Sequence, residues 1–127
     1  MFYTTNVCVI TGKSCFEHTP PLAKRLNLVL FNDLYDYYLA IFMFKLHNQM
    51  LPRSISAMFT YLSDVHIHSL RASEGFFLPR VRLSICKQFV VYSGVQCWSK
   101  LSYNLKTCKS VYEFKRMLYL KLSSNYA

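Results

Sequence analysis

Residues 32–52 read NDLYDYYLAIFMFKLHNQMLP and predict the central helix of the fold. Asn32 or Asp33 is a suitable N-cap, and acidic residues in a first turn favour the positive end of the helix dipole. Pro52 provides the stop, because the residue before a proline avoids the α conformation. About 18 residues lie between these signals, which corresponds to roughly 27 Å of helix.

The side chains of this helix indicate that it is buried on most sides. A rotation of about 100° per residue brings two acidic residues, an alanine and a histidine onto one stripe. That stripe consists of Asp33, Asp36, Ala40 and His47. Nearly all the other residues are aromatic or aliphatic, which predicts a core position. The longest uncharged run, residues 37–44, is far shorter than the roughly 20 residues that a membrane span needs.

The composition favours one small, mainly helical domain. Of the 127 residues, 53% are hydrophobic and 17% aromatic, so the chain can bury a substantial core. Only 3 glycines and 4 prolines are present, which favours helices over a sandwich of many short strands. We expect residues 1–8 to form a weakly structured lead and residues 9–127 to form a single domain.

One segment predicts β-structure. Val81, Leu83 and Ile85 alternate with polar residues, a pattern typical of a half-buried strand whose arginines face water. Residues 88–92 can form a second strand that pairs with the first. The predicted fold class is therefore mainly α with a short β-hairpin, arranged around the long buried helix.

Helical signals return after this hairpin. Gly94 ends the second strand, and residues 95–98 fit one helical turn that places Trp98 in the core. Further on, Ser110 and Glu113 have the spacing of a capping box at the start of a last helix. The apolar face of that helix is either Val111, Phe114, Leu118 and Leu122, or Met117 and Leu120. A short helix is also expected after Pro52, with an apolar stripe of Ile55, Met58, Phe59 and Leu62.

The positive charge is concentrated in the second half of the chain. The net charge is +9; residues 1–74 contribute +1, from six basic and five acidic residues, and residues 75–127 contribute +8, from nine and one. A basic half suggests an anionic partner such as the backbone of RNA or DNA, whereas the alternative is an ordinary solvated surface. The residues predicted to contact phosphates are Arg80, Arg82, Lys87, Lys115 and Arg116.

The cysteines indicate a reducing compartment. There are 5 of them, an odd number with wide spacing, so a disulfide framework is not expected. The N-terminus has neither a basic region nor a long apolar run, and no secretory signal is visible. We therefore expect an intracellular protein, in the cytoplasm or the nucleus, that is not secreted.

No motif in the chain predicts a metal, a cofactor or a small-molecule substrate. Gly12-Lys13-Ser14 lacks the earlier glycine of a phosphate-binding loop, because Val7 stands at that position. His66 and His68 have the spacing of a ligand pair, but only Cys15 and His18 form another such pair. Cys97 or Cys108 could be imagined in a catalytic dyad with His66, although inert buried cysteines explain them better. No catalytic residue is predicted.

Several sequence pieces together resemble a known protein family. In order along the chain they are His18-Thr19-Pro20-Pro21-Leu22, Leu26-Asn27-Leu28, the aromatic helix from Tyr35 through His47-Asn48 to Leu51-Pro52, Asp64-Val65-His66 with Arg71, Leu78-Pro79-Arg80-Val81-Arg82, Gly94 with Trp98, and Ser110 with Phe114 and Lys115. This order and spacing resemble the segment that follows the polymerase core in reverse transcriptases of animal non-LTR retrotransposons, the LINE class with its jockey and CR1-like groups. The resemblance runs from about Val9 to about Leu122.

The resemblance implies a parent protein that copies RNA into DNA with metal ions held by palm aspartates. This chain has no Asp-Asp pair, and Asp33 and Asp36 suit a helix start better than a metal site. It also departs from the family pattern at Leu70, Val95, Ser99 and Ser102. The expectation is a non-catalytic C-terminal fragment that supports an upstream reverse transcriptase domain and contacts nucleic acid. The alternative is a structural protein-interaction module with no nucleic-acid role.

Overall fold

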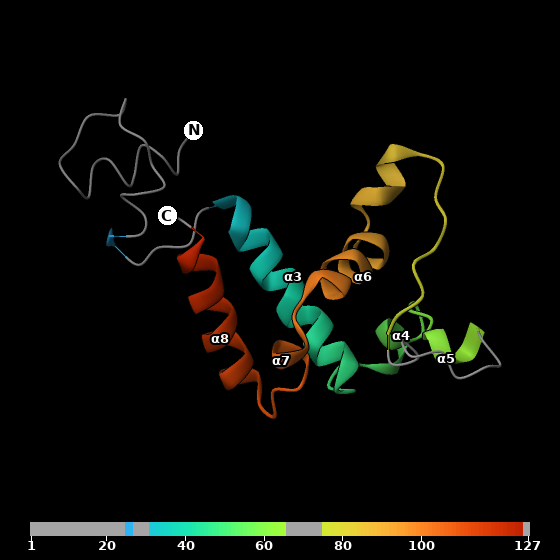
Figure 1. The fold of residues 1–127 in the computed structure, drawn as a ribbon. Coiled ribbons are helices and arrows are strands. Elements are labelled where there is room, and N and C mark those ends of the chain that lie inside the picture. Colours follow the sequence, from blue (N-terminus) through green and yellow to red (C-terminus); the bar gives the residue numbers. More distant parts are fainter. Residues whose placement is uncertain (1–24, 27–30, 66–74, 126–127) are drawn as a thin grey trace.

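The computed structural model describes residues 25–26, 31–65 and 75–125 of the chain, and the architecture is helical (Figure 1). The elements in this part of the chain are α3 (Phe31–His47), α4 (Arg53–Ser56), α5 (Leu62–Val65), the 3-10 helix η1 (Ser84–Gln88), α6 (Val90–Lys100), α7 (Tyr103–Lys106) and α8 (Val111–Ser124). The expected mainly α architecture is present. The segments predicted around Gly12, Pro20 and His66 lie outside the described residues.

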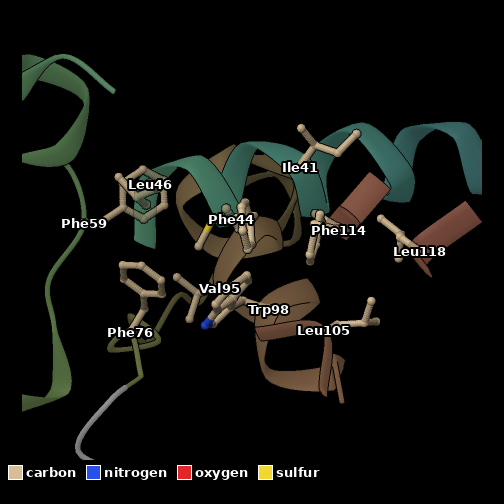
Figure 2. Close-up of a cluster of buried hydrophobic side chains, with 12 residues drawn as sticks. Ile41, Phe44, Leu46, Phe59, Phe76, Val95, Trp98, Leu105, Phe114 and Leu118 are labelled. Carbon is tan, nitrogen blue, oxygen red and sulfur yellow. The ribbon is translucent and has the colours of Figure 1, made fainter. Parts of the chain in front are cut away.

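Helix α3 runs through the middle of the fold, and α6 and α8 pack against different sides of it (Figure 1). Met43 and Phe44 at its centre are completely buried. The ring of Phe44 stacks on Phe114 of α8, with 4.4 Å between the ring centroids and 20° between the planes (Figure 2). The rest of the core comes from all parts of the described chain: Ala40, Ile41, Leu46, Phe59, Phe76, Val95, Trp98, Leu105 and Leu118.

The central helix ends earlier than the proline signal suggested. It stops at His47, where Gln49 adopts a left-handed conformation with φ of 57°. The Gln49 N–H donates to the carbonyl of Leu46 at 3.1 Å, and the Met50 N–H donates to the carbonyl of Lys45 at 2.8 Å. These two bonds form a Schellman motif, which satisfies the last carbonyls without help from Pro52. Gly usually occupies the left-handed position, so glutamine was not a visible stop signal.

The predicted β-hairpin is wrong. Residues 84–88 form η1, and residues 90–92 belong to α6, while the only pairing in the described residues is an isolated antiparallel bridge between Tyr61 and Phe76. The alternation at residues 81–85 led to a wrong strand prediction, because Leu83 and Ile85 face solvent rather than the core. Residues 90–98 also fit a helical period, with Val91, Val95 and Trp98 on one face, and tertiary burial of that face favours the helix.

Gly94 lies where α6 packs against α3. A Cβ atom at this position would stand 2.8 Å from the sulfur of Met43, which is closer than real Cβ atoms come to other atoms. Val95 and Trp98 follow on the same helix and are almost fully buried. The glycine therefore serves helix packing in α6, rather than ending a strand.

Helix α8 begins at the expected cap. The Oγ of Ser110 accepts a hydrogen bond from the Glu113 N–H at 3.1 Å. The Glu113 carboxylate accepts from the Lys109 N–H at 3.3 Å, one residue earlier than in a standard capping box. Of the two faces considered, the buried one is that of Phe114 and Leu118, flanked by the half-buried Val111 and Leu122; Met117 and Leu120 are exposed.

Replacing Gln49 with glycine should stabilise the protein by about 0.5–1 kcal/mol, because an L-residue in the left-handed region costs about 1–2 kcal/mol and glycine does not carry this penalty. Urea unfolding followed by circular dichroism measures the effect. Gln49→Ala keeps the side-chain clash and should give no gain. A Gln49→Gly variant that is less stable than the parent chain would contradict the left-handed stop.

Gly94→Val should destabilise the fold by about 1–3 kcal/mol, the usual cost of overpacking a filled core. Gly94→Ala should change stability by less than about 1 kcal/mol, because alanine's higher helix propensity and the flexibility of Met43 offset the close contact. Thermal and urea unfolding of both variants check the pair. Equal stability of the valine variant and the parent chain would show that α6 and α3 are further apart than the contact between Gly94 and Met43 indicates.

Candidate functional site

The five residues predicted to bind phosphates lie on two separate surfaces. Arg80 and Arg82 belong to the extended segment before η1, and Lys87 belongs to η1 itself. Lys115 and Arg116 lie on α8, on the opposite side of α3 and α6 from η1 (Figure 1). All five side chains are exposed. The structure therefore brings together the first three by chain proximity and the last two on one helix, but it does not unite the two sets.

The cations of α8 lie between tyrosines. Tyr112, Lys115, Arg116 and Tyr119 have the spacing i, i+3, i+4 and i+7, so they share one face of the helix. We call these four residues the α8 stripe. Tyr112 is 75% exposed and Tyr119 is partly buried. The tyrosines were absent from the sequence prediction, although their helical spacing with the two cations was a signal that could have revealed them.

Further tyrosines continue this surface onto α3. Tyr37 and Tyr38 make an edge-to-face contact with 5.5 Å between their ring centroids. Burial raises the pKa of Tyr37, and the neighbouring Tyr38 and Tyr119 raise it further. The α8 stripe is thus continuous with a group of neutral aromatic side chains, which offers flat apolar surfaces beside positive charge.

A hollow of about 390 Å³ is lined by side chains of both charges. It is lined by Asp33 and Asp36 from the start of α3, and by Lys100 of α6 and Lys121 of α8. The two aspartates therefore face lysines across the hollow. This mixed lining does not favour an anionic ligand, and it makes Lys100 and Lys121 a useful contrast to the α8 stripe.

The thiols considered for catalysis are in environments that keep them protonated. Burial raises the pKa of Cys97, and Asp36 raises it further although Lys100 opposes this effect. Burial also raises the pKa of Cys108, and Glu113 adds to the increase. A nucleophilic cysteine requires the opposite shift, towards the thiolate. The histidine of the imagined dyad, His66, lies outside the described residues.

An apolar groove of about 420 Å³ lies between α3, the α4 region and the start of α6. Aliphatic and aromatic side chains line it throughout: Tyr35, Tyr38, Leu39, Phe42, Ile55, Met58, Phe59, Val90 and Val91. Tyr38 and Met58 are 62% and 61% exposed. The predicted apolar stripe after Pro52 thus divides, with Phe59 in the core and Met58 on the surface. We call this feature the α3–α4–α6 groove.

A further hollow of about 480 Å³ lies over the aromatic end of the core. His47, Phe76 and Trp98 line it, and the ammonium group of Lys106 lies 5.6 Å from the centroid of the Trp98 ring. The Nδ1 atom of His47 is buried and has no hydrogen-bond partner among the described residues. Trp98 is 3% exposed, so its role here is to support the core rather than to present a stacking face.

The described residues contain neither a metal-binding cluster nor a membrane-spanning helix. Residues 25–26, 31–65 and 75–125 contain no group of three or more His, Cys, Asp or Glu side chains placed to hold a metal ion. Within the same ranges, no helix has the length and apolar character needed to cross a membrane. Comparison of the chain with protein-family models, with curated proteins and with solved structures found no match in any of the three.

Proposed function

We propose that this chain is a non-catalytic accessory segment of a reverse transcriptase of the non-LTR retrotransposon type, and that it contacts RNA or DNA. The observation that carries the nucleic-acid role is the α8 stripe, in which Lys115 and Arg116 lie between Tyr112 and Tyr119. Cations beside aromatic rings are the usual combination for single strands, because phosphates pair with the charges and bases stack on the rings.

The positions of the acidic residues and thiols support a role without catalysis. Asp33 lies in the first turn of α3, and both it and Asp36 line a hollow that also contains lysines. A two-metal polymerase site needs carboxylates that converge on the metal ions instead. The pKa values of Cys97 and Cys108 are raised, which disfavours thiolate chemistry. In this proposal the catalytic aspartates belong to an upstream domain.

The arginines near η1 provide a second contact with the same nucleic acid. Arg80, Arg82 and Lys87 are exposed on a segment remote from α8 (Figure 1). A strand that contacts both surfaces must pass around the fold, so the two sets should contribute independently to affinity. Cys86, Cys97 and Cys108 are free thiols, which supports placing this binding in a reducing compartment, the cytoplasm or the nucleus.

The second candidate function is a structural protein-interaction module with no nucleic-acid role. The α3–α4–α6 groove favours it, because exposed Tyr38 and Met58 form an apolar surface of the kind that marks contact sites. The occupant in this second proposal is another chain or an upstream domain. An environment-sensitive dye should bind the parent chain and bind a Met58→Ser variant less; equal dye binding by the two would contradict an accessible apolar groove.

Neutralising the cations of the α8 stripe should weaken RNA binding specifically. Lys115→Gln with Arg116→Gln removes two phosphate contacts, so the slope of log K against log salt for single-stranded RNA should fall by about 1.4. Fluorescence anisotropy across a salt series measures this slope. Lys100→Gln with Lys121→Gln makes the same change in net charge and should leave the slope nearly unchanged. An equal fall of the slope in both double variants would show that only the net charge of the protein matters.

Truncating Tyr112 should distinguish single strands from duplexes. Tyr112→Ala removes a stacking surface worth about 1–3 kcal/mol per base, so affinity for single-stranded RNA should drop by about tenfold or more. Duplex RNA of equal length should bind as before, because its bases are already stacked. Tyr103→Ala, at an equally exposed tyrosine of α7, is the matched control. An equal loss for both forms of RNA would exclude stacking at Tyr112.

A further inference from the structure

One face of α3 is only partly covered by the other helices of the described fold; at its start, the hydroxyl oxygens of Tyr35 and of Ser93 in α6 lie 3.4 Å apart. Tyr35, Tyr38, Phe42 and Lys45 have the spacing i, i+3, i+7 and i+10, so they form one line along the helix. This is the spacing at which one helix meets another along a seam. Helices α6 and α8 contact α3 on its other sides, through Met43 and Phe44 (Figure 2).

The surroundings of this line have the form of a groove for a helix. Ile55 and Met58 form one wall and Val90 and Val91 the other, while Leu39 and Phe59 lie beneath. Each wall has a residue that packs against the core, Ile55 on one side and Val91 on the other. Phe59 is buried and lies with 6.0 Å between its ring centroid and that of Phe42. A groove with fixed walls and an apolar floor is one of the recurring ways in which proteins bind amphipathic helices.

Charge around the groove selects the partner. The half-buried Lys45 continues the line along α3, Arg53 begins α4 two residues before Ile55, and Lys87 precedes Val90 by three residues. Asp33 and Asp36 line the neighbouring hollow shared with α6 and α8, which adjoins the groove at Tyr35 and Leu39. Among the described residues that line the groove itself, none is acidic. Carboxylates therefore complement the rim of this groove, and lysines or arginines do not.

We propose that the α3–α4–α6 groove binds an amphipathic helix of another protein, with leucine-like side chains in the groove and carboxylates along its flanks. The line from Tyr35 to Lys45 rises by about 15 Å, which matches about three turns of a bound helix. This inference rests on the second candidate function and names the chemistry of its partner. It does not require the α8 stripe, because α8 lies on another side of α3 than α4 and α6 do (Figure 1).

A second copy of the chain is a poorer occupant than an acidic helix. In a twofold dimer the same surface meets itself, so Lys45 and Arg53 of both copies would be brought into one interface. Like charges facing each other in an interface are unfavourable. The acidic residues that could relieve this repulsion, Asp33 and Asp36, lie in the other hollow.

The test uses two synthetic probes. Both are fluorescein-labelled, hydrocarbon-stapled helices of about three turns, with leucine at i, i+3, i+7 and i+10; one has glutamate on both flanks and the other has lysine. Anisotropy titrations with the full chain should show binding of the glutamate peptide, at least about tenfold tighter than the lysine peptide. The double variant Tyr38→Ser with Met58→Ser should bind the glutamate peptide about tenfold more weakly, or weaker still. Both residues are mainly exposed, so circular dichroism should show an intact fold.

Charge exchange provides the decisive control. Lys45→Glu with Arg53→Glu should reverse the preference, so that the lysine peptide binds tighter than the glutamate peptide. A gain of binding cannot come from loss of folding. The proposal is overturned if neither peptide binds the parent chain, if the exchanged variant keeps the original preference, or if sedimentation shows a dimer that Met58→Ser dissociates. Lys115→Gln with Arg116→Gln should leave peptide binding unchanged, so failure of the RNA proposal remains distinguishable.

Discussion

The contact of α3 with its neighbours is the constraint on which the rest of the structure depends. Met43 and Phe44 have no solvent-exposed surface, one pressed against Gly94 of α6 and the other stacked on Phe114 of α8. Loss of a buried phenylalanine ring typically costs about 3–5 kcal/mol, a large part of the stability of a domain this small. The positions of α6 and α8, and hence of every surface discussed, follow from how closely each can approach this helix.

Each side of α3 consequently has a different character. The side towards α8 carries tyrosines and leads to the cations of the α8 stripe, whereas the α3–α4–α6 groove is apolar with cations at its rim. The third side, with Asp33 and Asp36, is shared by carboxylates and lysines. These surfaces adjoin along α3, because Tyr38 lies beside Tyr37 and also lines the groove, and Tyr35 and Leu39 line both the groove and the charged hollow.

The elements that were predictable from sequence are those with local signals. The aromatic period of α3, the Ser110 cap of α8 and the burial of Trp98 each follow from residues within a few positions of one another. The hairpin was wrong because alternation at 81–85 does not reveal whether a core exists beside it. The groove could not be predicted either, since it depends on the left-handed stop at Gln49 and on where α6 begins.

The stacking of Phe44 on Phe114 has a consequence for synthesis of the chain. The two rings are separated by 70 residues, so the partner of α3 is made long after α3 itself. At about 5–20 residues per second, roughly 4–14 seconds pass between them on the ribosome. During that interval Phe44 of α3 lacks the Phe114 ring that stacks on it. Nascent chains that stop before α8 never gain this contact. The last helix therefore completes the core only when synthesis of the chain is nearly finished.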